Sequence, residues 1–340
     1  MNIVAEKISK QKVMEVRSEP HQNSLWMLRV LIIFFKLIGL ATFTHRFDMQ
    51  KKRTLYIFQY SKFGIVYNAV LISLMLASNY ILIPLTINLE YENKSNFTEG
   101  FDIVQSIFGT VVICTILLFY CVYQKSLVRI MNRLTDIEHE IDCLCSLYNP
   151  IRRQRVSCNL IIVCILNTCL LIVLVTTEIL VDRSLVSWLS DILPTFHVGW
   201  LIMQYFMLVT ILQTDFGDVN RALQNLSRVS TPDLRPQTLC QTRRVIVTNS
   251  TVHQLLKLRD VHCHLCEISG TVSDFYSLPI LFGITFLFLT LVYNGYFFLF
   301  FLLSTDDYEN FANYVCWFIY VIYPLALFTN RITKILNEVE

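Results

Sequence analysis

Charged residues are scarce in this chain. Asp, Glu, Lys and Arg make up 16% of its 340 residues, whereas soluble domains hold about 25%. Hydrophobic residues make up 54% of the sequence, a balance that excludes an ordinary soluble domain. The net charge is only +2 and the basic residues are spread along the chain. We therefore expect no nucleic-acid partner.

The chain also lacks the motifs of enzymes. It has no glycine-rich nucleotide loop, no paired carboxylates within an apolar run and no Ser-His-Asp spacing. The nearest approach to a metal motif is His262–Cys266, with His253 upstream. On one continuous helix these side chains would point in different directions, whereas zinc needs four converging ligands. We predict no enzyme activity, no cofactor and no bound metal, with a zinc site as the alternative.

Long apolar runs account for the missing charge. Each is close to the roughly 20 residues that cross a bilayer as a helix. Because the runs are continuous rather than alternating, they indicate helices and not a membrane β-barrel. The predicted fold class is an all-α polytopic transmembrane helical bundle. Its six spans are expected at about 63–84, 103–123, 160–181, 193–212, 278–303 and 311–328.

Lys and Arg are distributed very unevenly between the segments that join these spans. Counted from the N-terminus, 26 of the 28 lie in alternate segments, and only Lys94 and Arg183 lie in the others. Cytoplasmic segments of membrane proteins accumulate Lys and Arg. The pattern therefore predicts a cytoplasmic N-terminus, six crossings and a cytoplasmic linker at 213–277.

The outer segments that follow from this topology carry two further signals. None of the eleven cysteines falls in 86–102, 182–192 or 304–310, so we expect free thiols rather than disulfides. Glycosylation sequons begin at Asn93 and Asn96 in the first outer segment. Two more, at Asn225 and Asn249, fall in the cytoplasmic linker and are expected to stay unmodified.

The cytoplasmic segments should contain helices of their own. Leu25–Thr44 is apolar but contains Arg29 and Lys36; we interpret it as an interfacial helix or a shallow re-entrant, with a seventh span as the alternative. Gln124–Arg155 is expected to form two helical pieces, and 242–276 a long amphipathic helix that leads into span five. Pro84 is expected to end span one.

Polar and aromatic residues collect in the outer halves of the predicted spans. Such groups are costly in hydrocarbon and usually face a cavity or a partner, although Tyr and Trp also anchor helices at the bilayer surface. We expect a ligand pocket in which Glu178 and His197 border an aromatic wall. The candidate ligand-binding residues are Tyr80, Glu178, His197, Trp200, Tyr293 and Tyr296.

Two stretches of sequence resemble insect gustatory receptors. One is Phe35-Lys-Leu-Ile-Gly39-Leu, ahead of the first span. The other begins with Leu258-Arg-Asp-Val-His262 and ends in Val292-Tyr293-Asn-Gly-Tyr296. The cytoplasmic N-terminus and the long inner segment before span five are also similar to that family. The resemblance implies a plasma-membrane receptor for a small tastant, and a homo- or hetero-tetrameric, ligand-gated cation channel built with related subunits in membrane lipid.

The chain departs from this family in one respect. Members have a seventh span that lines the ion pathway, whereas six spans are expected here, so the resemblance implies a subunit deficient in the pore. Two other classes of membrane protein are the alternatives. A secondary transporter of a small organic solute would usually show broken helices in matching halves. A G-protein-coupled receptor would have an outward N-terminus.

Overall fold

In the part of the chain that the structure describes, the fold consists of seven long helices, two short helical segments and one β-hairpin. The computed structural model describes residues 30–50, 53–88, 96–144, 150–181, 188–230, 249–303 and 308–339. A short helix at 30–37 precedes the other elements. The other elements, in chain order, are β1 (Phe43–Gln50), β2 (Arg53–Tyr60), α2 (Lys62–Asn88), α3 (Asn96–Val122), α4 (Gln124–Leu144), α5 (Pro150–Val181), η1 (Trp188–Ile192), α7 (Leu193–Ser230), α8 (Asn249–Leu303) and α9 (Tyr308–Val339).

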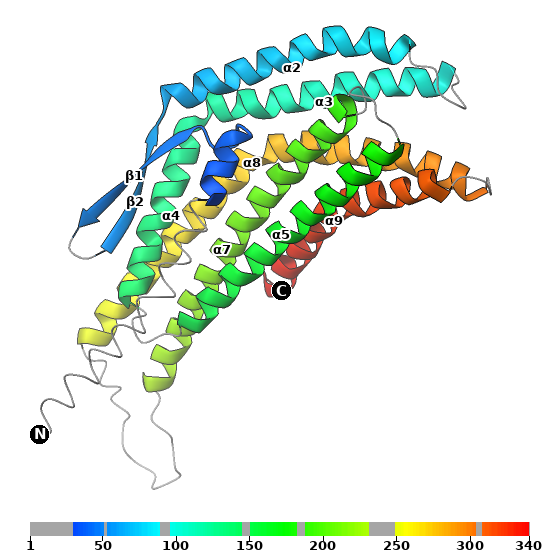
Figure 1. The fold of residues 1–340 in the computed structure, drawn as a ribbon. Coiled ribbons are helices and arrows are strands. Elements are labelled where there is room, and N and C mark those ends of the chain that lie inside the picture. Colours follow the sequence, from blue (N-terminus) through cyan, green and yellow to red (C-terminus); the bar gives the residue numbers. More distant parts are fainter. Residues whose placement is uncertain are drawn as a thin grey trace, which may run out of the picture.

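Six of these helices are long and apolar enough to cross a membrane, namely α2, α3, α5, α7, α8 and α9. This confirms the predicted helical bundle. α2 and α3 form an antiparallel pair, α7 packs on α8, and α9 packs on α5, α7 and α8. α4, the first half of α8 and the end of α7 extend together away from α2 and α3 (Figure 1). These are the helical extensions expected on the cytoplasmic side.

The end of the first span agrees with expectation, although the helix is longer. The apolar stretch ends at Leu85, directly after Pro84, while α2 itself continues through Pro84 to Asn88. α8 likewise runs through Pro279 as one helix of 55 residues. A proline removes a single hydrogen bond from the helix ladder, and the helix continues where the remaining bonds and the packing suffice. α4 ends at Leu144 and α5 begins at Pro150; Asn149, where the break was expected, lies outside the described residues.

The β-hairpin is an element that the sequence analysis missed. β1 and β2 pair antiparallel, from Phe43 opposite Tyr60 to Gln50 opposite Arg53. The buried rings of Phe43 and Phe58 meet edge to face at 5.1 Å. The side chain of Asn132 in α4 accepts a hydrogen bond from Phe58 N at 2.8 Å and donates one to Phe58 O at 3.0 Å. The amide thus continues the ladder and docks the hairpin on α4.

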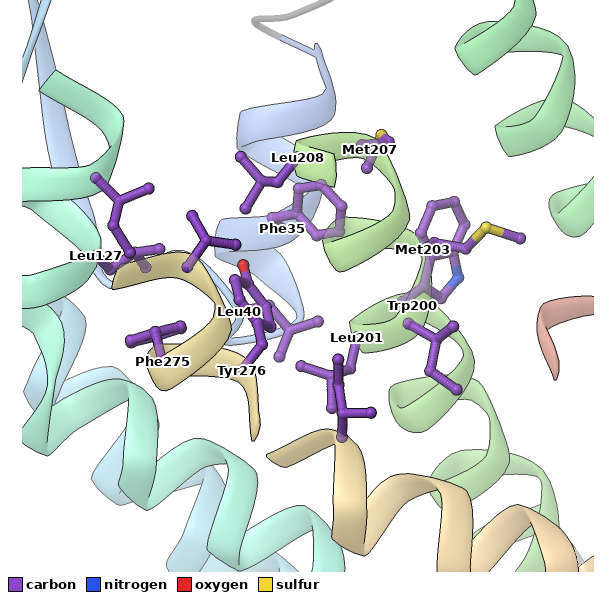
Figure 2. Close-up of a cluster of buried hydrophobic side chains, with 14 of the residues drawn as sticks. Phe35, Leu40, Leu127, Trp200, Leu201, Met203, Met207, Leu208, Phe275 and Tyr276 are labelled. Carbon is purple, nitrogen blue, oxygen red and sulfur yellow. The ribbon is translucent and has the colours of Figure 1, made fainter. Parts of the chain in front are cut away.

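Residues 30–42 enter the interior of the bundle instead of lying on its surface. The helix at 30–37 buries Ile32 and Phe35, and the turn that follows buries Leu40 completely. Figure 2 shows Phe35 and Leu40 among side chains of α7 and α8, including Trp200 and Tyr276. In its described part, the segment expected to be an interfacial helix or a shallow re-entrant therefore inserts between the spans.

Side chains from the spans satisfy the exposed backbone of this inserted turn. Asn68 Nδ2 donates to Gly39 O at 2.9 Å, and Gln204 Nε2 donates to Leu40 O at 3.1 Å. Gln124 Nε2 donates to Thr42 O. Irregular backbone at membrane depth is tolerated only where protein surrounds it and completes its hydrogen bonds. These three amides fulfil that condition, and they fix the insertion relative to α2, α7 and α4.

Candidate functional site

Glu178 is a carboxylate buried between α5 and α9. Its side chain is only 5% exposed. Asn313 Nδ2 donates to Glu178 Oε2 at 2.9 Å, and Trp317 Nε1 donates to the same oxygen at 3.1 Å. Thr177 Oγ1 donates to Asn313 Oδ1 at 2.9 Å, which orients the amide. A buried carboxylate is costly unless hydrogen bonds stabilise it, and the donors described here are neutral groups of α9.

His197 and Trp200 lie one helical turn apart on α7, where the inserted segment covers them. The His197 ring bonds the backbone of Leu193 at 3.1 Å and also that of Ile38. Trp200 packs against Phe34, with ring centroids 4.4 Å apart. Trp200 is 4% exposed, and its indole N–H has no hydrogen-bond partner among the residues that the structure describes. Both side chains therefore anchor residues 34–38 and lie within the protein interior.

Tyr293 belongs to a third group, formed by α3 and α8. Its hydroxyl donates to Asp102 Oδ1. Its ring stacks on Phe101 with centroids 4.9 Å apart and an interplanar angle of 6°. The Tyr293 ring also contacts Phe297, with ring centroids 4.9 Å apart. This cluster joins the first turns of α3 to the last turns of α8, at the end that the charge pattern assigns to the outside.

The six predicted ligand-binding residues thus have different surroundings. Glu178 joins α5 to α9, His197 and Trp200 face the inserted segment, and Tyr293 joins α3 to α8. Tyr80 is 86% exposed and Tyr296 51% exposed on the surface of the chain. These two side chains lie on the surface of the chain, so their part in a ligand pocket stays a prediction. Their helices turn them outward, where aromatic side chains suit a bilayer surface.

The His262–Cys266 motif lies within the helix α8. His262 and Cys266 lie one turn apart on α8, with Nδ1 and Sγ 3.8 Å from each other. Among the described residues, no group of three or more His, Cys, Asp or Glu side chains converges as metal ligands would. The eight cysteines that are described are free thiols. Asn93 and the Asn96 side chain lie outside the described parts, so the glycosylation sites stay predictions.

Several residues of these clusters were not identified from the sequence. Asn313 was not identified, although a polar residue in the first turns of an apolar helix indicates a buried contact. Asp102 and Asp191 were assigned to outer segments and not to a site. Gln105 Nε2 donates to Asp191 Oδ1 at 3.2 Å, which joins α3 to η1. No periodicity in one helix reveals such a contact, because it depends on how two helices meet.

Six helices that are long and apolar enough to cross a membrane indicate a multi-pass helical membrane protein. The 7tm chemosensory receptor family matches residues 28–340, and the chain belongs to this family. That family is one of chemoreceptors for small chemical ligands and not of enzymes. No curated protein matches the chain.

Proposed function

We propose that this chain is a gustatory-type chemoreceptor that binds a small tastant between the outer halves of its spans. In this proposal it lies in the plasma membrane with a cytoplasmic N-terminus. It assembles with copies of itself or with related subunits into a tetrameric, ligand-gated cation channel. The observation that carries the proposal is the hydrogen-bonded carboxylate of Glu178 between two apolar helices of a chemoreceptor-family chain.

The contacts of α9 suggest how binding would be transmitted. Near its outer end α9 donates to Glu178 through Asn313 and Trp317. Near its inner end Arg331 donates to Thr210 Oγ1 of α7 at 2.6 Å. These two contacts are separated by about 27 Å along one helix, from 18 residues at about 1.5 Å each. A ligand that exchanges with either donor on Glu178 would therefore change the forces on a helix that also contacts α7 at the cytoplasmic side.

Such a ligand acts by stabilising one conformation of the protein more than the other. The ligand shifts the equilibrium toward the open state only by the difference between its binding free energies for the open and the closed state. In the proposed mechanism the ligand replaces hydrogen bonds that hold α5 to α9 in the closed state. No covalent step is involved. α8 and α9 run unbroken through Pro279 and Pro324, and this continuity supports a receptor over a transporter built on discontinuous helices.

Calcium imaging tests the proposal. The chain is expressed in cells with related chemoreceptor subunits and exposed to a panel of sugars, amino acids, amines and carboxylic acids. We expect at least one compound to evoke calcium entry. Accumulation of a compound inside the cells without any conductance would identify a transporter instead. A panel that evokes neither, with the protein present at the surface, would overturn the proposal.

A pair of substitutions on α5 locates the response. Glu178→Gln removes the charge but keeps the size, and Gln can still accept one hydrogen bond. We expect the concentration for half-maximal response to change by about tenfold or more, because a hydrogen bond to a charged group contributes about 1.5–3 kcal/mol. Thr176→Ala is the matched control, since Thr176 is exposed and bonds its own helix at Ile172 O. It should leave the response unchanged.

A further inference from the structure

The outer segments of the chain are strongly acidic. The stretches 86–102, 182–192 and 304–310 together contain nine Asp and Glu residues but only two basic residues, Lys94 and Arg183. A surface of one charge sign attracts ligands of the opposite sign and raises their local concentration. A ligand that approaches the spans from outside would therefore pass an acidic rim, formed by these three segments, which attracts cations.

Two carboxylates of this rim, one in α3 and one in η1, are each hydrogen-bonded to a neighbouring side chain. Asp102 accepts the hydrogen bond of the Tyr293 hydroxyl, and Asp191 accepts one from Gln105. Both carboxylates act electrostatically on the same Tyr293 side chain. Asp102 and Asp191 are each half-buried, so they stay accessible from the outer surface. Two negative charges beside one hydroxyl favour a positively charged occupant between them.

The side-chain oxygen of Gln105 is a hydrogen-bond acceptor that receives no hydrogen bond from the described residues. Its side chain is 5% exposed, and its amide points at Asp191 because Nε2 donates there at 3.2 Å. The same contact fixes which end of the amide is the oxygen. Gln105 Oε1 is buried and accepts no hydrogen bond from any described residue. A buried acceptor without a partner is costly, and a ligand with an N–H group would satisfy it.

Aromatic rings complete the cluster. Phe101 stacks on Tyr293, and Phe297 in turn stacks on Tyr314 of α9 with centroids 5.6 Å apart and an interplanar angle of 5°. The face of an aromatic ring attracts a cation within about 6 Å of its centroid. The same rings offer apolar surface to an organic substituent. Metal ions would use the carboxylates but gain little from these rings.

We propose that Asp102, Asp191 and Gln105 form a recognition site for a protonated primary or secondary amine that carries an apolar or aromatic substituent. The ammonium N–H groups donate to the two carboxylates and to Gln105 Oε1, and the substituent packs on the rings of Phe101 and Tyr293. This site is formed by other residues than the Glu178 cluster, and its biological meaning rests on the proposed receptor function. Binding itself is measured without any channel response.

Three probes test the chemistry on the purified full chain in lipid nanodiscs, by isothermal titration calorimetry. They are 2-phenylethylammonium, the uncharged 2-phenylethanol and the quaternary phenethyltrimethylammonium. We expect the primary ammonium to bind at least about tenfold more tightly than either of the others. Equal binding of the alcohol would overturn the role of the carboxylates. Equal binding of the quaternary ion would overturn the role of Gln105.

Variants locate the site. Asp102→Asn and Asp191→Asn should each weaken binding of 2-phenylethylammonium by about tenfold. Glu99→Gln removes the same charge one turn away on α3 and should weaken it by less than about twofold. If all three variants weakened binding equally, the ammonium would be attracted by the general negative potential and not by a defined site, and the proposal would be overturned. Tyr293→Phe keeps the stacked ring and provides a second, milder variant if an Asp variant fails to fold.

The two proposals fail in different ways. If 2-phenylethylammonium binds but no compound evokes calcium entry, the proposed receptor function is contradicted and the amine site is supported. Calcium entry evoked by uncharged compounds, with no ammonium binding by calorimetry, would sink the amine site and leave the receptor function standing.

Discussion

Glu178 places a carboxylate between two apolar helices, and its immediate surroundings explain how the protein tolerates it. The carboxylate oxygen Oε2 receives an amide N–H from Asn313 and an indole N–H from Trp317. Hydrogen bonds to a charged group are stronger than those between neutral groups. Removing the carboxylate would leave two donors without this acceptor inside the bundle, so the three residues act as one unit.

Gly39 marks the position where the inserted segment turns between the spans. Its φ is +81°, a left-handed conformation that side chains with a Cβ rarely adopt. A Cβ at this position would lie 2.6 Å from Leu117 Cδ2 and 2.8 Å from Asn68 Oδ1. The turn thus requires glycine for its backbone conformation and for the space around it.

Gly39→Ala is therefore expected to destabilise the protein by about 2 kcal/mol or more, from the left-handed conformation and the overlap combined. The midpoint of thermal unfolding in detergent measures the effect. Gly270→Ala is the matched control, because Gly270 lies within α8 and a Cβ there would meet no atom within 4 Å. Alanine favours a helix by about 1 kcal/mol over glycine. A Gly39 variant as stable as the Gly270 variant would contradict the described turn.

The hairpin and α4 show how one side chain joins two elements. Asn132 forms two hydrogen bonds with the backbone of Phe58, and β2 packs along α4. Asn132→Asp keeps the acceptor for Phe58 N–H but removes the donor to Phe58 O. The variant should loosen the hairpin, and amide hydrogen exchange of residues 53–60 should become faster by about tenfold, as expected for the loss of a buried hydrogen bond.

Thr135→Ala serves as the control on the same helix, because the Thr135 hydroxyl bonds Met131 O within α4. Its effect on exchange in the hairpin should be negligible. Equal exchange in Asn132→Asp and in the unmodified protein would show that the hairpin is held by Phe43 and Phe58 alone.

Gly109 allows α3 to approach the start of α7 closely. A Cβ there would lie 2.8 Å from Cγ of Pro194 and 3.1 Å from Phe286. Pro194 is a rigid ring, so Gly109→Ala must push the helices apart, and overpacking of this kind costs about 1–3 kcal/mol. The unfolding midpoint should fall, whereas Gly100→Ala, which meets no atom within 4 Å, should leave it nearly unchanged.

The helices could be predicted from the sequence because each span depends on its own apolar run. The hairpin could not be predicted in the same way. Its residues 43–60 mix basic, polar and aromatic side chains, and the strand pairing is completed by Asn132, more than 70 positions away. Leu25–Thr44 was difficult for a similar reason, since its polar backbone is satisfied by Asn68, Gln124 and Gln204 from other helices.

The candidate site was only partly predictable. Glu178 and His197 were identified because ionisable groups at membrane depth are rare. Tyr80 and Tyr296 were included by composition, yet both are exposed. A single apolar helix does not reveal which of its faces meets protein and which meets lipid, because both faces are apolar. The grouping of Asp102, Gln105 and Asp191 likewise depends on the meeting of three elements.

At the scale of the whole molecule, the charge distribution predicts two sides of a membrane. The acidic segments 86–102, 182–192 and 304–310 lie at the helix ends that this charge pattern assigns to the outside. We predict that any N-linked sugar is attached only at Asn93 or Asn96. Its glycosidase-sensitive shift in mobility should disappear in the double Asn→Gln variant. A shift that survives there and is lost in Asn249→Gln would mean the opposite orientation.

The orientation of the spans is the central claim, because it decides whether Glu178, Asp102 and Asp191 lie near the outer surface, where the proposed ligand would arrive. Antibody labelling of intact cells tests it most directly, with one epitope tag at the N-terminus and, in a separate protein, one between α8 and α9. We predict that the tag between α8 and α9 is labelled on intact cells and that the N-terminal tag is labelled only after permeabilisation. Labelling of the N-terminal tag on intact cells would contradict the account.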